Sequence, residues 1–537
     1  MAKSKQKNYS YPVILISLIV CMIFRLYLTS AIGSKGVAYL SAGETLFILV
    51  ALSLAAGIEH SVSLLVENRM NKQMYDNVKR TVGAGGFLSL GLGILFMGII
   101  LLAGRKISDN LYNMPLSYMS VIICALAIPL FVLSGTFRGF FRGIGKFTLV
   151  CQSYIIFAVS YALFGSIFSF LLVKFGNKVA SLLRVEDYIG AYGAIGFSLG
   201  LLAASFVCLL HMGILFGLMN KRTVYNQGRD YSKKKEPITA LMLTVLLNAL
   251  TTMAVWFAVS FVLFIDGLYV FGVRESEFSM EFSYGEYYGK VFPIALLITA
   301  ILGLLTFKNI RSSLHFVYRE ELRSARERLA FLIHRCVTVG LFATALLIAL
   351  SENILDILYK TNGSEVAGYL RIQSACIIFA LFTIVFFKLL SSLGYGSIVM
   401  IICVLSSAVH AFLSFIFVHT AGMSIKGVII SDLIFWVIAA VMGYVIIARC
   451  FQYTQEWFRT FLVSFIAAGI VCLISLLINK VLSPILGKGV CIAIIVTVGA
   501  LLEIIVLILL RGYSEEELEG SVLGKVMLAI GHTFNLL

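Results

Sequence analysis

Long apolar runs recur along the whole chain and are separated by short polar segments. Each run reaches roughly 20 residues, the length of α-helix that crosses a hydrocarbon layer about 30 Å thick. The pattern therefore predicts an all-α, polytopic membrane protein with about fourteen transmembrane helices. The polar segments between the runs are too short for a soluble domain of roughly 50 residues or more. The predicted helices lie near 11–32, 40–64, 81–103, 117–135, 147–173, 190–217, 237–270, 287–306, 331–350, 366–390, 394–419, 424–448, 458–479 and 487–510.

The composition supports the same fold class. Hydrophobic residues make up 60% of the 537 residues and charged residues only 13%. Soluble domains are about 45–50% apolar and about 25% charged. The excess of apolar residues predicts a surface that lipid solvates. The 10 cysteines stand singly in apolar runs, with no CxxC pair or disulfide framework, and are interpreted as small packing residues.

The net charge of +15 is distributed in short loops, which indicates membrane topology and not nucleic-acid binding. Lys and Arg gather at 67–80, 136–146, 218–236 and 307–328, with Lys233 and Lys234 in the third of these loops. The positive-inside rule places such loops in the cytoplasm. With an even number of spans, both termini are expected to be cytoplasmic, in a multi-pass protein of the cell membrane. The acidic segment 272–290, which includes Glu275 and Glu277, is expected outside.

An internal repeat divides the chain. The segment KISDNLY at 106–112 matches NILDILY at 353–359, an offset of 247 residues. The repeat predicts two related six-helix bundles, at 1–220 and 221–450, followed by two extra helices and a cytoplasmic tail at 451–537. Transporters built from repeats move one half against the other to alternate access. No nucleotide-binding motif and no sizeable loop is present. We therefore expect that the protein is not an enzyme, and that it has no catalytic residues, no cofactor and no metal site.

Four segments then resemble a known family: RLYLTSAIGSKGVAYL at 25–40, AAGIEHSVSLLVEN at 55–68, RGFFRGIG at 138–145 and REELRSARERLAFLIHR at 319–335. They are similar to the MOP (multidrug/oligosaccharidyl-lipid/polysaccharide) superfamily, and most similar to its polysaccharide-biosynthesis and stage V sporulation protein B-like group. The resemblance implies a flippase that moves a lipid-linked oligosaccharide or polysaccharide precursor, on an undecaprenyl-type carrier, by alternating access. It also implies membrane lipids and glycan-biosynthesis enzymes as partners. Glu59 departs from the family, which usually has proline there.

Ionisable residues inside the spans are the candidate site, because each costs about 2.5–3.5 kcal/mol at the centre of a bilayer. Arg25 precedes Lys35 by ten residues and Glu44 follows it by nine, so a hairpin turning there puts both at one depth. They form either a structural salt bridge or a substrate site in which Arg25 binds a lipid diphosphate. Glu59 lies further along the helix of Glu44, on nearly the same face. It either takes part in ion coupling or is a carboxylate at the cytoplasmic end of the span that extends toward water.

Four more basic residues are candidates for substrate binding. Arg138 and Arg142 are expected on the turn after the fourth span, where they either bind lipid head groups and fix topology or make the first contact with an anionic head group. Arg335 and Arg371 are candidates because they belong to the second half, where the pathway should be mirrored. The sequence predicts a basic central cavity lined by spans one, two, seven and eight, the spans that carry Arg25, Glu44, Asp266 and Lys290.

Titratable residues inside the spans are candidates for ion coupling, and they are Asp266, His410, Asp432 and Glu503. Asp266 and Asp432 are assigned this role, while the packing interpretation is preferred for the isolated His410. Two other functions stay open. A drug or cation antiporter of the multidrug and toxin extrusion (MATE) type would favour acidic over basic groups in its cavity, whereas a membrane-embedded glycosyltransferase or ligase would need acid–base residues on a sizeable loop. Arginines within spans favour an anionic substrate.

Overall fold

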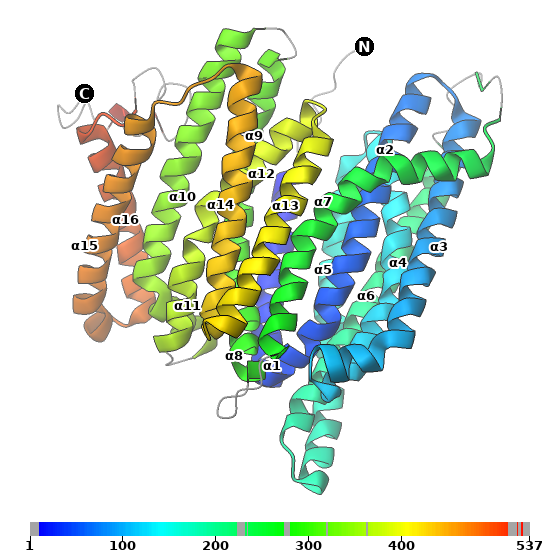
Figure 1. Cartoon of the computed structure of the whole chain (residues 1–537), viewed down its shortest axis with the longest axis horizontal. Helices are drawn as coiled ribbons and strands as arrows, with labels where there is room; N and C mark the ends of the chain where they lie inside the picture. Colours follow the sequence, from blue (N-terminus) through cyan, green and yellow to red (C-terminus); the bar gives the residue numbers. More distant parts are fainter. Residues whose placement is uncertain are drawn as a thin grey trace. The chain divides into compact units, whose positions relative to one another are not determined.

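The computed structural model consists of α-helices with short π- and 3-10-helical turns, and no β-strand occurs among the residues it describes (Figure 1). The described residues are 10–222, 231–232, 235–272, 280–317, 321–360, 364–513, 524 and 528–529. Lys233, Lys234, Glu275 and Glu277, which entered the topology prediction, lie outside them. The chain groups into two compact units. One comprises Met1–Gly289 and Cys403–Ile425, and the other comprises Lys290–Ile402 and Lys426–Leu537.

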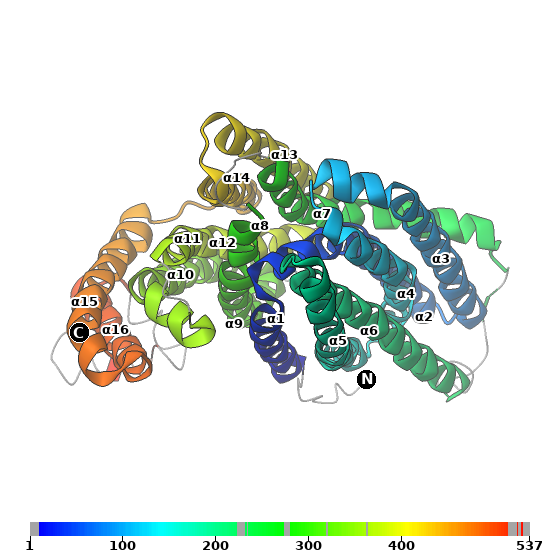
Figure 2. The ribbon, with the colours of Figure 1, turned by 90° about the horizontal axis from the view of Figure 1, so that it is seen from below.

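The first unit contains the first eight helices and most of α13. Within it, α5 lies along α6 and α3 lies along α4, in both views (Figures 1 and 2). The helices are α1 Ser10–Phe47, α2 Ser53–Asn71, α3 Tyr75–Lys106, α4 Tyr118–Gly143, α5 Phe147–Leu183, α6 Asp187–Arg222, α7 Ile238–Gly272, α8 Met280–Glu286 and α13 Gly396–Phe415.

The second unit contains α9 to α12, most of α14, and the C-terminal pair α15 and α16. The pair packs against α10 (Figure 2). The helices are α9 Phe292–Val317, α10 Leu322–Tyr359, α11 Ser364–Ser374, α12 Cys376–Ser392, α14 Ser424–Phe451, α15 Val463–Leu486 and α16 Lys488–Leu509. The expected division into bundles at 1–220 and 221–450, with an extension at 451–537, stays a prediction.

The first helix reverses direction at Gly33. A straight helix would separate Arg25 and Glu44 by about 28 Å at 1.5 Å per residue, yet their side chains are 3.1 Å apart. Gly33 has φ 69° and ψ 174°, outside the helical region. Glycine adopts such a positive φ without the steric penalty that a Cβ atom imposes. The turn therefore falls two residues before Lys35, where the hairpin was expected.

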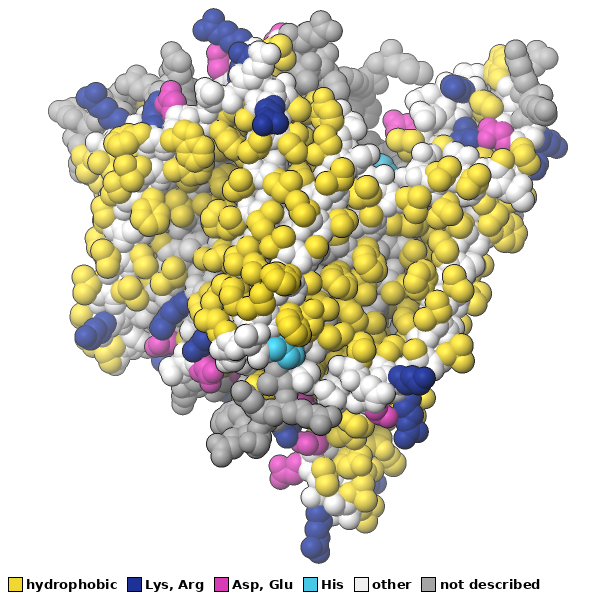
Figure 3. All heavy atoms as spheres, in the orientation of Figure 1, with side chains coloured by type: hydrophobic (Ala, Val, Ile, Leu, Met, Phe, Trp, Pro, Cys, Tyr) yellow, Lys and Arg dark blue, Asp and Glu magenta, His cyan; other side chains and the backbone are white. Residues whose placement is uncertain are grey.

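The number of spans agrees with the apolar pattern. Thirteen helical segments of the described chain are long and apolar enough to cross a membrane. The first of them, Ile14–Asn71, has 58 residues and contains the reversal at Gly33, so it supplies two crossings. Thirteen segments with one counted twice give fourteen spans, and the chain is a multi-pass membrane protein. Hydrophobic side chains cover the middle of the helices and charged ones gather near their ends (Figure 3).

The repeat is reproduced in the element boundaries. α3 begins at Tyr75 and α10 begins at Leu322, which is the same offset of 247 residues that the motifs gave. The paired motifs end at residues 112 and 359, one residue past the π-helical turn Ile107–Leu111 and at the end of α10. The offset of the motifs is therefore also the offset between the starts of these two helices, and the two related bundles stay a prediction.

The fifth span is longer than its apolar run. Its helix ends at Leu183 instead of near 173. Lys174 ends the apolar run without ending the helix, because lysine is a good helix former. Its ammonium group lies 4.1 Å from the ring centroid of Phe170, one turn earlier. Hydrophobicity thus sets where a helix meets lipid, and the helix itself continues until its backbone conformation changes at Arg184, with φ 55°.

Candidate functional site

Arg25 is the centre of a polar cluster within the first unit. Its Nη1 donates to Glu44 Oε2 at 3.1 Å, and its Nη2 donates to the Tyr288 carbonyl at 3.2 Å. The Tyr288 hydroxyl donates to the same Glu44 oxygen at 2.9 Å. The guanidinium carbon lies 4.6 Å from the centroid of the Tyr288 ring. The side chains of Arg25 and Glu44 are each only 13% exposed, so this ion pair is largely shielded from solvent.

Tyr288 belongs to a π-helical turn, Tyr287–Val291, that follows α8. Further contacts seat this segment against α1: Thr29 donates to the Gly289 carbonyl at 3.2 Å, and Ser34 donates to Glu286. Tyr288 and Gly289, which belong to the first unit, therefore pack against the first two spans at the Arg25 cluster. The expected cavity and the participation of span seven at this point stay predictions.

A second cluster joins α2 to α4. Glu59 Oε2 accepts from Arg138 Nε at 3.1 Å and from the Tyr154 hydroxyl at 3.1 Å. Its other oxygen lies 2.6 Å from Arg142. Arg138 also donates to Ser134 at 2.7 Å. One carboxylate thus serves two guanidinium groups, which leaves one excess positive charge at the cluster.

Small residues explain why these side chains meet. Gly135, Gly139 and Gly143 form a ridge of α4 with a period of four residues. A Cβ atom on Gly139 would lie 2.7 Å from the Glu59 carbonyl oxygen, so only glycine allows this approach of α4 to α2. Such small-residue contacts are a common mode of helix packing in membranes. Arg138 and Arg142 lie next to the ridge and reach Glu59 across the contact.

The two arginines differ in exposure. The Arg138 side chain is 1% exposed, whereas that of Arg142 is 39% exposed. The expectation that Arg138 lies on a surface turn is therefore wrong. α4 continues to Gly143, because the apolar residues around Arg138 keep the helix packed inside the unit. The Arg138 guanidinium lies 4.9 Å from the ring centroid of Phe131 and 5.1 Å from that of Tyr154, contacts that suit its planar charge.

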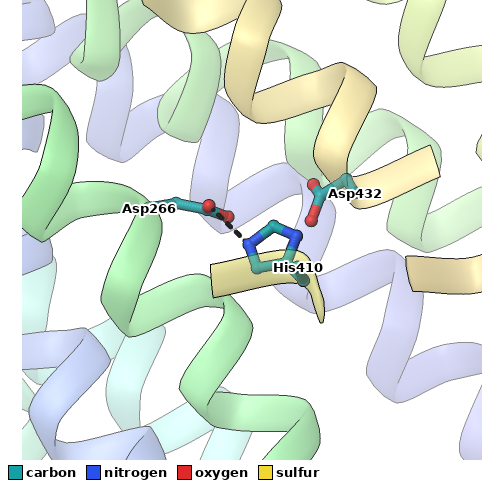
Figure 4. Close-up of side chains that lie close together, drawn as sticks. All are labelled: Asp266, His410 and Asp432. Atoms are coloured by element: carbon teal, nitrogen blue, oxygen red, sulfur yellow. Dashed lines mark hydrogen bonds and ion pairs between the residues drawn. The ribbon is translucent and has the colours of Figure 1, made fainter. Parts of the chain in front are cut away.

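Asp266 on α7 is held by α13. His410 Nε2 lies 2.8 Å from Asp266 Oδ1, and the Ser414 hydroxyl donates to the same oxygen at 3.4 Å (Figure 4). Asp266 and His410 are 1% and 0% exposed. His410 was interpreted as a packing residue, but its ring is a partner of a buried acid. Asp432, which Figure 4 also draws, is buried on α14 in the second unit.

The predicted arginines of the second unit lie in different settings. Arg371 on α11 pairs with Glu352 at 2.6 Å and donates to Ser351 at 3.0 Å, and its side chain is 41% exposed. Arg335 is half-buried on α10. Arg371 thus lies in an accessible ion pair, whereas Arg335 is only half-buried. Their expected substrate contacts stay predictions.

Two residues of these clusters were not identified from the sequence: Tyr288 and Tyr154. Each pairs with an acid that is distant in sequence, with separations of 244 residues for Tyr288–Glu44 and 95 for Tyr154–Glu59. An apolar pattern treats tyrosine as one more hydrophobic residue. The signal that was available is the YYGK segment at 287–290, two adjacent tyrosines beside a lysine within an apolar run.

With this geometry in place, comparison with known proteins adds the fold. No known family profile matches the chain, and no characterised relative matches it by sequence. The structure matches an inward-facing multidrug-resistance MATE-family transporter of the MOP superfamily with a TM-score of 0.66 at 14% identity, covering 83% of this chain and 98% of that chain. An outward-facing MATE-family transporter matches with a TM-score of 0.56 at 15% identity, covering 82% and 95%.

A third match is a MOP-superfamily transporter from Pyrococcus furiosus whose binding pocket is described as having reverse polarity. Its TM-score is 0.53 at 15% identity, and the match covers 83% of this chain and 96% of that chain. All three solved structures are transporters, and the predicted all-α fold class is confirmed. This chain has the fold of the MATE-family transporters of the MOP superfamily.

Proposed function

We propose that this chain is a flippase that moves an anionic lipid-linked oligosaccharide or polysaccharide precursor across the membrane by alternating access. The observation that carries the proposal is the excess positive charge at the Glu59 cluster. Arg138 satisfies Glu59 from the buried side, so Arg142 is a second cation with an accessible guanidinium group. An anion that leaves water needs compensating charge, which the hydrocarbon region does not provide.

Chemistry favours a phosphate group at Arg142. A guanidinium group presents paired N–H donors that match phosphate oxygens, and such charge-assisted hydrogen bonds are about twice as strong as neutral ones. The Arg25 cluster is the proposed second contact. Both terminal nitrogens of Arg25 donate hydrogen bonds, to Glu44 and to the Tyr288 carbonyl, and these bonds fix the orientation of its guanidinium group. In this proposal the substrate-binding residues are Arg25, Glu44, Arg138, Arg142, Arg335 and Arg371, and the ion-coupling residues are Glu59, Asp266 and Asp432.

The second candidate is a MATE-type drug or cation antiporter. It is favoured by the fold and by the buried Asp266–His410 pair, which is a place for a proton or cation. The two candidates differ in the charge of the cargo. A cationic drug is repelled by the extra charge at Arg142, whereas a lipid diphosphate is attracted to it.

Transport by the purified protein in liposomes separates the candidates. One assay follows the accessibility of a fluorescent glycan on a polyprenyl diphosphate carrier, and the other follows efflux of a fluorescent lipophilic cation. We expect movement of the lipid-linked glycan and none of the cation. Cation efflux without glycan movement would replace the flippase with the antiporter, and movement of neither would remove both.

Variants locate the anion contact. Arg142→Gln should lower glycan movement by about 10-fold or more, since one charge-assisted hydrogen bond contributes about 1.5–3 kcal/mol. Arg142→Lys should retain part of the activity through its charge. Arg105→Gln is the matched control: it also removes an arginine from an ion pair of the first unit, but Arg105 is 83% exposed and, among the described residues, pairs with Asp109 four residues further along. Equal activity of Arg142→Gln and wild type would exclude the proposed contact.

A further inference from the structure

The C-terminal helix pair contains a buried acid without a partner. Glu503 on α16 is 5% exposed, and neither of its carboxylate oxygens has a hydrogen-bond partner among the described residues. It lies in a ridge of buried residues spaced four apart, which is the face that α16 packs against its neighbours: Cys491, Ile495, Gly499, Glu503 and Leu507.

The neighbours of this ridge are α10 and α15. A Cβ atom on Gly499, one turn before Glu503, would lie 3.3 Å from side-chain atoms of both Leu346 on α10 and Val471 on α15. Leu507, one turn after it, packs in the cluster at the start of α15. Glu503 therefore faces α10 and α15 between these two levels. No described charged side chain of either helix pairs with it.

If the carboxyl group of Glu503 were ionised in this place, it would need a positively charged ligand. An ionised acid inside a span costs several kcal/mol, unless a charge or donors compensate it. Hard metal cations bind to several oxygen ligands at once, and the ridge around Glu503 consists of apolar residues and glycine. A proton needs no further ligand. The packing therefore favours the protonated acid.

A cluster of hydroxyl groups lies about one helical turn from this position. Thr338 Oγ1 on α10 is 3.2 Å from Ser464 Oγ on α15 and 2.9 Å from the Tyr513 hydroxyl after α16. The His334 ring stacks on that of Tyr513, with centroids 4.0 Å apart. By helical spacing, Thr338 and Ser464 lie about one turn, roughly 5 Å, beyond the level of Glu503.

The cluster leads toward the polar end of these helices. Arg459 donates to the carbonyl groups of Arg511 at 3.2 Å and Gly512 at 2.9 Å, and it pairs with Glu456 at 3.8 Å. The side chain of Glu456 is 75% exposed, so this end reaches water. Two charged or titratable groups lie around Tyr513. They are His334 on α10 and Arg459 on the π-helical turn that precedes α15.

We propose that Glu503 is a proton-binding site, and that the hydroxyls of Thr338, Ser464 and Tyr513 connect it with water at the polar end of α15 and α16. A hydroxyl donates and accepts at the same time, so a chain of them passes a proton without a charged side chain in between. On deprotonation the proton leaves Glu503 for water through this chain, and a carboxylate remains. The nearest donors for that carboxylate are the hydroxyls of this cluster, which lie about one turn away. Ionisation of Glu503 therefore favours a shift of α16 along α10 and α15 that brings the carboxylate toward them. The inference holds whatever cargo the chain transports.

Infrared difference spectroscopy of the reconstituted protein tests the protonation. Wild type should show a carboxylic-acid C=O band that disappears as the pH is raised. Glu503→Gln should lack this band, and Glu503→Asp, which keeps an acid, should show it at a shifted frequency. Glu352→Gln is the control, because it removes an acid whose side chain is 57% exposed, and it should leave the band unchanged. Identical spectra of wild type and Glu503→Gln would show that Glu503 is ionised and would overturn the proposal, as would a band that does not titrate.

The route is tested by exchange into heavy water. Thr338→Val and Tyr513→Phe should slow the isotope shift of the Glu503 band by about tenfold each, the equivalent of one lost hydrogen bond. Ser181→Ala is the control, because that hydroxyl lies in the first unit and, among the described residues, donates to the Lys178 carbonyl of its own helix. Unchanged exchange rates in both variants would exclude the hydroxyl route. Loss of the band on adding sodium at constant pH would identify a metal-cation site instead of a proton site.

Discussion

Glu59 and Glu503 are both buried glutamates on membrane-spanning helices, and their surroundings are opposite. Glu59 is 3% exposed and is contacted by two arginines and a tyrosine. Glu503 is 5% exposed and has no hydrogen-bond partner among the described residues. Equal burial thus gives a carboxyl group that cross-links three side chains in one place and a carboxyl group without a hydrogen-bond partner among the described residues in the other. The number of partners, and not the depth, decides what a buried acid does.

The largest effect is expected at Glu59. Replacing it by methionine leaves the buried Arg138 without a counter-charge, and breaking a buried ion pair in this way costs about 3–5 kcal/mol. Unfolding of the detergent-solubilised protein should therefore shift strongly toward lower stability. A second substitution, Arg138→Met, removes the unpaired charge and should restore most of the loss. If Glu59→Met is as stable as wild type, the contrast with Glu503 has no basis.

An intermediate effect is expected at Arg25. Arg25→Ala leaves Glu44 with the Tyr288 hydroxyl alone, at a cost of about 1.5–3 kcal/mol for a charge-assisted hydrogen bond. Exchanging the two charges, with Arg25→Glu and Glu44→Arg, should restore part of the folded abundance if the pair is structural. It should not restore glycan transport if Arg25 binds the substrate. Unchanged abundance together with unchanged transport in Arg25→Ala would contradict both roles.

The smallest effect, of opposite sign, is expected at Glu503. Glu503→Met replaces an unpaired polar group by an apolar side chain of similar length, so it should stabilise the protein by roughly 1 kcal/mol, toward the lower end of the cost of burying an unsatisfied polar group. The same unfolding assay measures it beside Glu59→Met. Destabilisation of both variants by equal amounts would mean that Glu503 has a partner in the folded protein.

The sequence predicted the fold more completely than the site. Apolar runs gave the fourteen spans, and the motif offset of 247 residues matched the offset between α3 and α10. The distances of Arg25 and Glu44 from Lys35 predicted their contact, because helix geometry alone relates two residues across one tight turn. The contact of Arg138 with Glu59 was not predicted, since it depends on how two separate helices pack.

What the sequence determined by itself is therefore local: where the chain enters lipid, where glycine reverses it, and which segments repeat. These properties follow from the cost of burying polar groups in hydrocarbon and from the geometry of one helix. Tertiary structure alone decided the partners of the buried charges. The glycine ridge of α4 brings Arg138 to Glu59, while the apolar ridge of α16 brings Glu503 no counter-charge. The sequence gives the charge of each side chain, but the helices that pack against it determine whether a counter-charge lies nearby.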